Sequence, residues 1–274
     1  MPRLASLPLT IILIAISGVA CAPTRLALPS GSGTPGADYA AAFGDATGRC
    51  REVRTLQAEL ALSGRIGRQR LRGRVLAGLV PDALRLEAVS PFGSPAFILV
   101  ADGSRGTLLL SRDRRVLQDA PPAEILDALI GMSIGADDLR ALLSGCVKAS
   151  AEPIGARAYG PDWIAVDLAG GSMIFLQRQT AGWRIVAGRH LGLEIEYARF
   201  NRVAGLGREL PTQVRIESTG PGGAARVSLT VGQSQIEVNS ELPRDGLVAV
   251  KIPPGLTPIS LEELRDAGPL GARN

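Results

Sequence analysis

The sequence predicts a mainly β fold with a few helices, in which one large, strongly curved antiparallel sheet has its helices on one side. Two observations lead to this expectation. Apolar and polar residues alternate along much of the chain from Leu56 to Val231, which is the pattern of strands with one buried and one solvated face. Turn-forming clusters, such as Asp102-Gly103 and Gly160-Pro161-Asp162, separate the alternating stretches.

Strands are expected wherever this alternation is sustained between turn signals. The predicted strands cover residues 56–63, 70–77, 84–87, 96–101, 107–111, 163–168, 173–178, 183–187, 193–197, 213–217 and 225–231.

A change of period marks the predicted helices. Residues 38–54 place Tyr39 and Phe43 on one face of a helix. Two short helices, at about 122–130 and 136–144, form an insert between the strands, with Pro122 at the start of the first and Gly145 after the second.

The chain continues beyond the last predicted strand, from Glu241 to about Ala267. Within this extension we expect a strand at Leu247–Ile252. Ser260 and Glu263 have the spacing of a capping box, which predicts a short C-terminal helix.

The first residues resemble a bacterial lipoprotein signal. Arg3 is the only charge before an apolar stretch, and Gly18-Val19-Ala20-Cys21 matches a loose form of the lipidation motif. We expect residues 1–20 to be removed and Cys21 to be acylated, which would anchor the chain to a membrane. Ordinary secretion, leaving a free thiol at Cys21, is the alternative.

Residues 21–37 are expected to be a flexible tether, because they are rich in Pro, Gly and Ser and show no periodicity. The G-x-G-x-x-G spacing of residues 31–36 follows no strand and opens no helix, so it predicts no dinucleotide site. Residues 38–274 are expected to form one folded domain.

The charge balance gives no basis for a nucleic-acid partner. The formal net charge is +4, or +3 without Arg3, and no run of five basic residues occurs. Lys148 and Lys251 are the only lysines, so nearly all positive charge is carried by arginine.

The sequence presents no catalytic or metal-binding constellation. His190 is the only histidine, and its place at a predicted strand turn is typical of a surface residue. Glu194 and Glu196 share a strand face that the alternation assigns to solvent, and Asp137-Asp138 suit a helix N-terminus. We therefore expect neither an enzyme nor a metal or other cofactor.

Cys50 and Cys146 are the only cysteines of the folded part. In an oxidising compartment a disulfide between them would close a long loop and stabilise the fold by about 4 kcal/mol. Two buried free thiols are the alternative, and the distance between the two Cα atoms decides between them.

Three segments together resemble the LolB family of outer-membrane lipoprotein receptors, within the LolA/LolB superfamily. They are LRLEAVSPFGSPAFIL at 84–99, LIGMSIGADDLRALLSG at 129–145 and LPTQVRI at 210–216. Their order and spacing match the family from about residue 38 to 236. The resemblance implies an incomplete β-barrel wrapped around the helical insert, with a hydrophobic cavity for lipoprotein acyl chains delivered by a LolA-like periplasmic carrier. The extension from about residue 241 departs from the receptor pattern.

The resemblance also implies a protruding loop whose apolar side chain helps to insert cargo into the membrane. The matching residue is Phe92, between Pro91 and Gly93. A residue bracketed by Pro and Gly in a tight turn has little core to enter. The alternative is that Phe92 folds back onto its own sheet.

The leading hypothesis is thus a lipid-anchored receptor or carrier at the periplasmic face of the outer membrane. Ala22 after Cys21, by resemblance to enteric sorting, favours the outer membrane. The alternative is a tethered β-scaffold with a filled core and no ligand. The predicted lining of the acyl cavity is Leu60, Leu62, Leu71, Val75, Leu84, Leu86, Ile98, Val100, Leu108 and Leu110.

Overall fold

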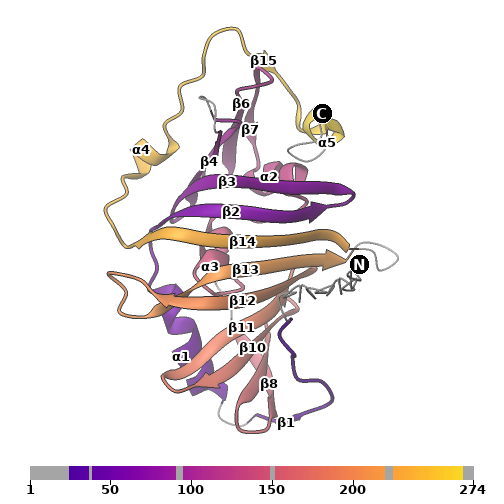
Figure 1. Cartoon of the computed structure of the whole chain (residues 1–274), viewed down its shortest axis with the longest axis vertical. Helices are drawn as coiled ribbons and strands as arrows, with labels where there is room; N and C mark the ends of the chain where they lie inside the picture. The colour runs from indigo at the N-terminus through magenta and orange to yellow at the C-terminus, as the bar shows by residue number, and fades with distance from the viewer. Residues whose placement is uncertain (1–24, 37–38, 91–94, 149–151, 220–224, 268–274) are drawn as a thin grey trace, which may run out of the picture.

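The computed structural model describes residues 25–36, 39–90, 95–148, 152–219 and 225–267 of the 274-residue chain. Within these ranges fifteen strands form a single open, strongly curved sheet, and five short helices lie against it (Figure 1). Neighbouring strands are antiparallel, apart from the parallel pair β7–β15. The predicted fold class is confirmed.

The elements follow the predicted order along the chain. The alternation does not predict β7 or β8. The helices are α1 (Tyr39–Arg51), α2 (Pro122–Ile130), α3 (Ala136–Leu143), α4 (Arg244–Val248) and α5 (Leu261–Ala267). The strands are β1 (Thr34–Pro35), β2 (Leu56–Ile66), β3 (Gln69–Val80), β4 (Ala83–Val89), β5 (Ile98–Asp102), β6 (Arg105–Leu110), β7 (Arg115–Ala120), β8 (Pro153–Tyr159), β9 (Trp163–Leu168), β10 (Ser172–Gln179), β11 (Gly182–His190), β12 (Leu193–Arg202), β13 (Glu209–Thr219), β14 (Ala225–Val238) and β15 (Thr257–Pro258).

The pairing of β14 with β2 joins two meanders, β8 to β14 and β2 to β7, into one sheet. Several ladders contain register shifts, and the one on β14 lies between Ser234 and Glu237, where Gln235 has φ 51°. Such bulges bend a strand and increase its twist. Gly64 lets β2 approach β14 closely, because a Cβ there would collide with the backbone of Ser228. The sheet therefore curls around its helices.

The concave face of the sheet carries the main core. Side chains that alternate along the strands point to this face, and among them Leu79, Leu84 and Leu99 are fully buried. In Figure 1, α1 lies behind the strands at one end of the sheet. Helix α3 lies behind its middle, and α2 lies behind β3, towards its other end. Helices this short are not stable alone, so their docking on the sheet holds them folded.

The outer face of β3 and β4 is covered by α4. Leu247 of α4 packs against Val80 and Ala83, and a Cβ at Gly78 would lie 2.6 Å from its Cδ1 atom. The expected strand at Leu247–Ile252 is wrong. Burial of Leu247 favours a helical turn here, and the chain from 249 to 256 forms no strand, consistent with the missing N–H groups of Pro253 and Pro254.

The N-terminal segment is docked on the sheet from Arg25 onward, which corrects the expectation of a flexible tether for this part. Leu26 and Leu28 cover an apolar patch on the outer face that includes Phe175 and Val186. Further along, Thr34–Pro35 pairs with β8 as strand β1. Burial of the two leucines supplies the stabilisation that composition alone does not reveal.

The C-terminal extension crosses the end of the sheet and returns to it. β15 pairs with β7, and the predicted capping box starts α5. Ser260 N–H donates to the Glu263 carboxylate (2.7 Å), and Glu263 N–H donates to Ser260 Oγ (3.1 Å). Arg265 pairs with Glu124 of α2 at 2.8 Å, which ties α5 to the helical insert.

A disulfide joins Cys50 of α1 to Cys146, which follows α3, and their Cα atoms are 5.7 Å apart. The linked residues are 96 positions apart in the sequence. In the chain-entropy model a bond that closes a loop of this length stabilises the fold by about 4–5 kcal/mol. Tyr197 also holds the chain at Cys146, because its O–H donates to the Cys146 carbonyl (2.8 Å).

We expect the variant Cys50→Ala/Cys146→Ala to lose about 4 kcal/mol of unfolding free energy, because its unfolded chain regains the loop entropy. Urea unfolding of both proteins measures the loss. In the unmodified protein, neither thiol should react with a labelling reagent after unfolding unless a reductant is added. Labelling without reductant would contradict the disulfide.

Tyr197 makes stability sensitive to alkaline pH. Burial raises its pKa well above the ordinary value, so the folded protein keeps the neutral phenol while the unfolded chain ionises at about pH 10. Its contribution is present below pH 10 and lost as the pH rises above it. We expect the unfolding free energy to fall above pH 10, and to fall less steeply in Tyr197→Phe. Equal slopes in the two proteins would contradict this assignment.

Candidate functional site: an apolar cavity inside the curved sheet

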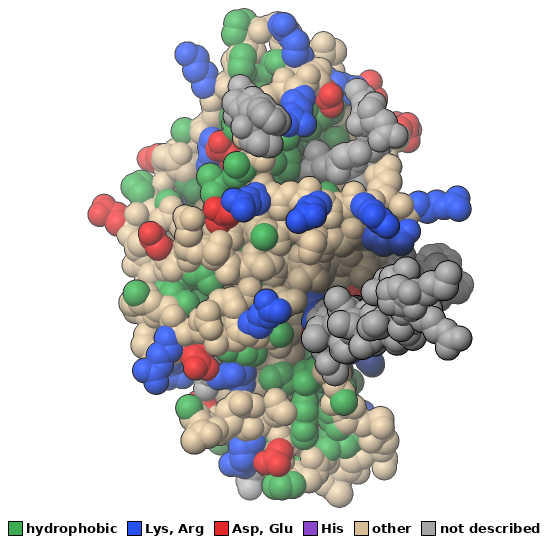
Figure 2. Space-filling view, in the orientation of Figure 1, with side chains coloured by type: hydrophobic (Ala, Val, Ile, Leu, Met, Phe, Trp, Pro, Cys, Tyr) green, Lys and Arg blue, Asp and Glu red, His purple; other side chains and the backbone are tan. Residues whose placement is uncertain are grey.

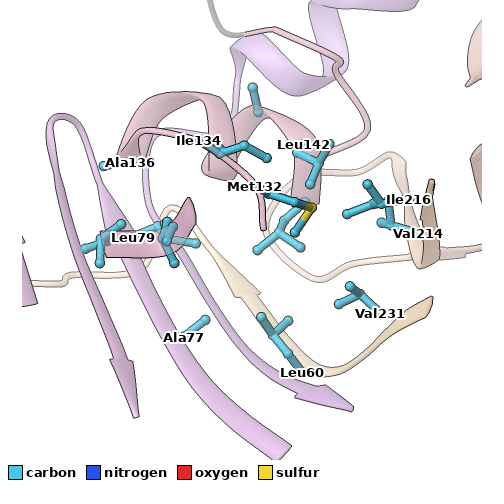
Figure 3. Packing of buried hydrophobic residues seen from close by; sticks show 14 of the residues in the cluster. Leu60, Ala77, Leu79, Met132, Ile134, Ala136, Leu142, Val214, Ile216 and Val231 are labelled. Atoms are coloured by element: carbon cyan, nitrogen blue, oxygen red, sulfur yellow. The ribbon is translucent and has the colours of Figure 1, made fainter. Parts of the chain in front are cut away.

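A cavity of about 540 Å³ lies between the concave face of the sheet and the α2–α3 insert. Leu60 and Val231 approach it from the sheet, and Met132 and Leu142 approach it from the helical side (Figure 3). All four side chains are buried, yet space remains between the two sides. This volume falls in the range typical of small-ligand sites.

The lining is almost entirely aliphatic. Among the described residues that line the cavity, Phe97 is the only aromatic one, and charge is confined to Arg72, Arg74, Arg112 and Asp113. A surface of this kind has few directional groups, so it suits a flexible hydrocarbon chain better than a polar or planar ligand.

The ten predicted lining residues fall into three groups in the structure: residues of the main core, residues that line the cavity, and residues on the opposite face of the sheet. Leu84 and Leu108 are fully buried in the main core and do not reach the cavity. Six residues line it: Leu60, Leu62, Leu71, Val75, Leu86 and Leu110.

The assignment of Ile98 and Val100 to the cavity is wrong. The main core contains Leu99 and Ala101 instead, so Ile98 and Val100 lie on the opposite face of β5. The segment Phe97-Ile-Leu-Val-Ala101 is a continuous apolar run, and such a run does not reveal which alternate set points inward.

The predicted lining residues all came from strands, so the prediction missed the cavity-lining residues that the helices contribute. Met132, Ile134 and Leu142 come from the helical insert, and Leu264 and Ala267 come from α5. The apolar stripe of the insert was visible in the sequence, but a stripe does not show whether it faces packed core or empty space. No local pattern indicated that α5 returns to the cavity.

The mouth of the cavity lies where β3 extends past β4. Residues Gln69–Gly73 pair with β2 but not with β4, so among the described residues this edge of β3 has no strand partner. The exposed residues around the cavity lie beside this edge: Arg72, Gly73, Arg74, Val89, Arg112 and Asp113. The side chains of Arg72 and Arg74 alternate with those of Leu71, Gly73 and Val75 and therefore point to the outer face of β3.

Two further predictions lie outside the described residues. These are the lipidation site Cys21 and the loop Pro91–Gly93, with Phe92 at its centre. The nearest described residues on either side of the loop that line the cavity are Val89 and Ala96.

His190 is buried, which corrects the expectation of a surface histidine. Its Nδ1 lies 2.8 Å from Ser172 Oγ, and its Nε2 lies 3.8 Å from a carboxylate oxygen of Asp138. Burial arises because β11 ends against β10 and the start of α3, a contact that the sequence does not show. Ser172 is also buried, and none of the three residues lines the cavity.

The other polar candidates form structural pairs. Glu194 pairs with Arg189 at 3.3 Å, and Glu196 pairs with Arg215 at 3.4 Å across neighbouring strands, on the solvated face as predicted. The described part of the chain holds no group of three His, Cys, Asp or Glu side chains that could bind a metal. Nor does any helix in it have the length and apolar character needed to cross a membrane.

A second, polar depression lies on the outer face of β12–β14 and β2. Gly232, Ser63 and Arg199 are among its lining residues, and the strands separate it from the apolar cavity. It offers no comparable apolar surface.

Comparison with known proteins gives likeness in structure alone. No protein-family model and no curated protein matches the sequence. Among solved structures, a LolA superfamily protein from Nitrosomonas europaea has 10% identity and a TM-score of 0.48, over 74% of this chain and 96% of that one. An outer membrane lipoprotein-sorting protein domain from Vibrio parahaemolyticus has 8% identity and a TM-score of 0.46, over 70% and 88%.

A DUF1329 family protein from Desulfovibrio piger has 10% identity and a TM-score of 0.50, over 73% of this chain and 92% of that one. At this identity the likeness bears on architecture and not on activity. The chain shares the fold of this DUF1329 family protein.

Proposed function

We propose that this protein is a lipid-anchored receptor or carrier of the bacterial envelope that binds acyl chains in its cavity. The observation that carries the proposal is the contiguous apolar cavity, which in the described part of the chain opens beside residues 69–73 of β3. A β-scaffold with a filled core, the alternative from the sequence, would have no such space.

The lining suits reversible transfer of an acyl chain. Removing a chain from water is favourable by about 0.8 kcal/mol per methylene, whether the chain enters a bilayer or a protein. A carrier must therefore bind the chain about as well as a bilayer does, or cargo would not be released. Aliphatic side chains such as Leu60, Leu142 and Val231 offer hydrocarbon contact without hydrogen bonds that would have to be broken on release.

The finer assignment comes from the sequence resemblance to the LolB family. In this assignment a LolA-like carrier delivers lipoproteins to the receptor. The acylated Cys21 holds the receptor at the outer membrane, and Phe92 assists the insertion of cargo. In this proposal the protein performs no catalysis, and the Ser172–His190–Asp138 group is a structural contact.

Gly73 offers a direct test of cavity occupancy. It lies on the concave face between Leu71 and Val75, and a Cβ there would meet no heavy atom within 4 Å. We expect Gly73→Trp to fold normally but to fill the mouth. Excluding two methylenes from burial, at about 0.8 kcal/mol each, would weaken binding of an acyl probe about tenfold. Displacement of the neutral fluorophore N-phenyl-1-naphthylamine by a lysophospholipid measures this affinity.

The matched control is Gly232→Trp, which places the same side chain in the polar depression on the outer face. This variant should bind the probe like the unmodified protein. Normal binding by a folded Gly73→Trp protein, or equal losses in both variants, would contradict occupation of the cavity by the acyl chain.

A further inference from the structure

The outer face of the β2–β3 hairpin is strongly basic. Residues 60–81 contain five arginines and no acidic residue. The arginines of β3 alternate with the inward-facing Leu71, Gly73 and Val75, so they point outward. One more arginine joins them from the start of β14, where it precedes the buried Val227. The exposed arginines of this surface, which we call the basic patch, are Arg65, Arg68, Arg70, Arg72, Arg74 and Arg226.

The basic patch carries more positive charge than its neighbours balance. Among the described residues, its only ion pair joins Arg74 to Glu59 at 3.3 Å. Arg65 and Arg70 are directly opposite in the β2–β3 register, an arrangement of like charges that destabilises a sheet. Figure 2 shows a row of basic side chains along the band that β2 and β3 occupy in Figure 1. An anionic partner on this face would relieve the repulsion.

Exposed apolar side chains lie next to the basic patch on the same face. Leu76 occupies the next outward position of β3 after Arg74, and Val89 is directly opposite Arg74 in the β3–β4 register. Both are exposed although they are large and apolar. Basic side chains that attract anionic lipids and apolar side chains that enter the headgroup region together strengthen binding to a membrane surface. The outer face offers both.

The N-terminal segment reaches the fold beside the basic patch. Arg25, the first described residue, pairs with Glu217 of β13. Glu217 is opposite Ser228 of β14, which is opposite Arg65, so Glu217 lies two strand spacings, about 10 Å, from Arg65 on the outer face. Cys21 precedes Arg25 by four residues, which span at most about 14 Å. An acyl anchor on Cys21 would therefore hold this face close to the bilayer.

We propose that the basic patch docks the protein on a bilayer that contains anionic phospholipid. The exposed apolar neighbours and the position of Arg25 favour a membrane over an acidic protein as the anionic partner. The cavity opens beside residues 69–73 of β3, so docking would bring its mouth near the lipid that donates or accepts an acyl chain. This surface goes beyond the proposed cavity function, and only the argument from the N-terminal segment rests on acylation of Cys21.

The test uses the full chain with Cys21→Ser, which cannot be acylated at that position. Its binding is measured by co-sedimentation with vesicles of phosphatidylcholine alone or of phosphatidylcholine mixed with phosphatidylglycerol. We expect binding to the anionic vesicles at low salt and little binding to the neutral ones. Binding to the anionic vesicles should be lost in about 0.5 M salt, where screening is strong. This comparison requires no substitution in the basic patch.

The variant Arg65→Gln/Arg70→Gln/Arg72→Gln removes three charges from the basic patch. An arginine near an anionic surface contributes about fivefold to affinity, so binding to the anionic vesicles should weaken about 100-fold. The replaced side chains are exposed, and the repulsion between Arg65 and Arg70 is removed. The variant should therefore melt at or above the temperature of the parent protein.

The matched control, Arg54→Gln/Arg105→Gln/Arg202→Gln, has the same change in net charge. These three arginines are exposed and lie at the end of the sheet opposite the β2–β3 turn. The control should bind anionic vesicles nearly as well as the parent. Equal losses in the two triple variants would overturn the inference, because net charge alone would then explain the binding.

The remaining outcomes separate this inference from the proposed function. Gly73→Trp, which fills the cavity mouth from the concave face, should bind vesicles like the parent while it loses affinity for the acyl probe. Failure to bind anionic vesicles at low salt would overturn the docking surface and leave the cavity function intact. Binding to soluble poly-glutamate without binding to vesicles would also overturn it, and would indicate an acidic protein as the partner.

Discussion

The cavity depends on how the end of α3 is fixed inside the curved sheet. Three contacts converge there: the Cys50–Cys146 disulfide, the hydrogen bond from Tyr197 to the Cys146 carbonyl, and the side-chain amide of Gln233, which donates to the carbonyls of Leu143 (2.9 Å) and Pro211 (2.7 Å). They tie the insert to α1, β12 and β14. With this end fixed, the insert cannot settle further into the sheet to fill the space beside it.

An unfilled apolar space inside a protein has an energetic cost. Interiors are normally packed as densely as organic crystals, and empty volume loses dispersion contacts. Here the wall is shared by strands, the α2–α3 insert and α5, so no single element can collapse to close it. A hydrocarbon ligand would restore the missing contacts, and an apolar cavity of this size attracts such a ligand more readily than water.

The sequence predicted the fold class and the faces of strands in which apolar and polar residues alternate strictly, as Leu60 and Leu62 of β2 show. It failed where alternation stops, at the apolar run containing Ile98 and Val100. It also missed β7, where Val116 and Leu117 are adjacent and both buried, and β8, which contains a Pro and a Gly and has little buried surface.

Other features depend on contacts between distant segments. The burial of His190, the docking of Leu26 and Leu28, and the return of α5 to the cavity each require knowledge of the three-dimensional neighbours. The six predicted residues that line the cavity from the sheet side follow from local periodicity, whereas the existence of empty space follows from how short helices fit a curved sheet. No local pattern records that fit.

The most direct test of the proposed ligand is native mass spectrometry of the Cys21→Ser variant, which cannot be acylated at that position, purified without detergent. We expect protein peaks with an added mass that collisional activation releases as an acyl lipid, and the adduct should be depleted in Gly73→Trp and retained in Gly232→Trp. A homogeneous, ligand-free protein that also takes up no lysophospholipid when titrated would contradict the claim that the cavity holds an acyl chain.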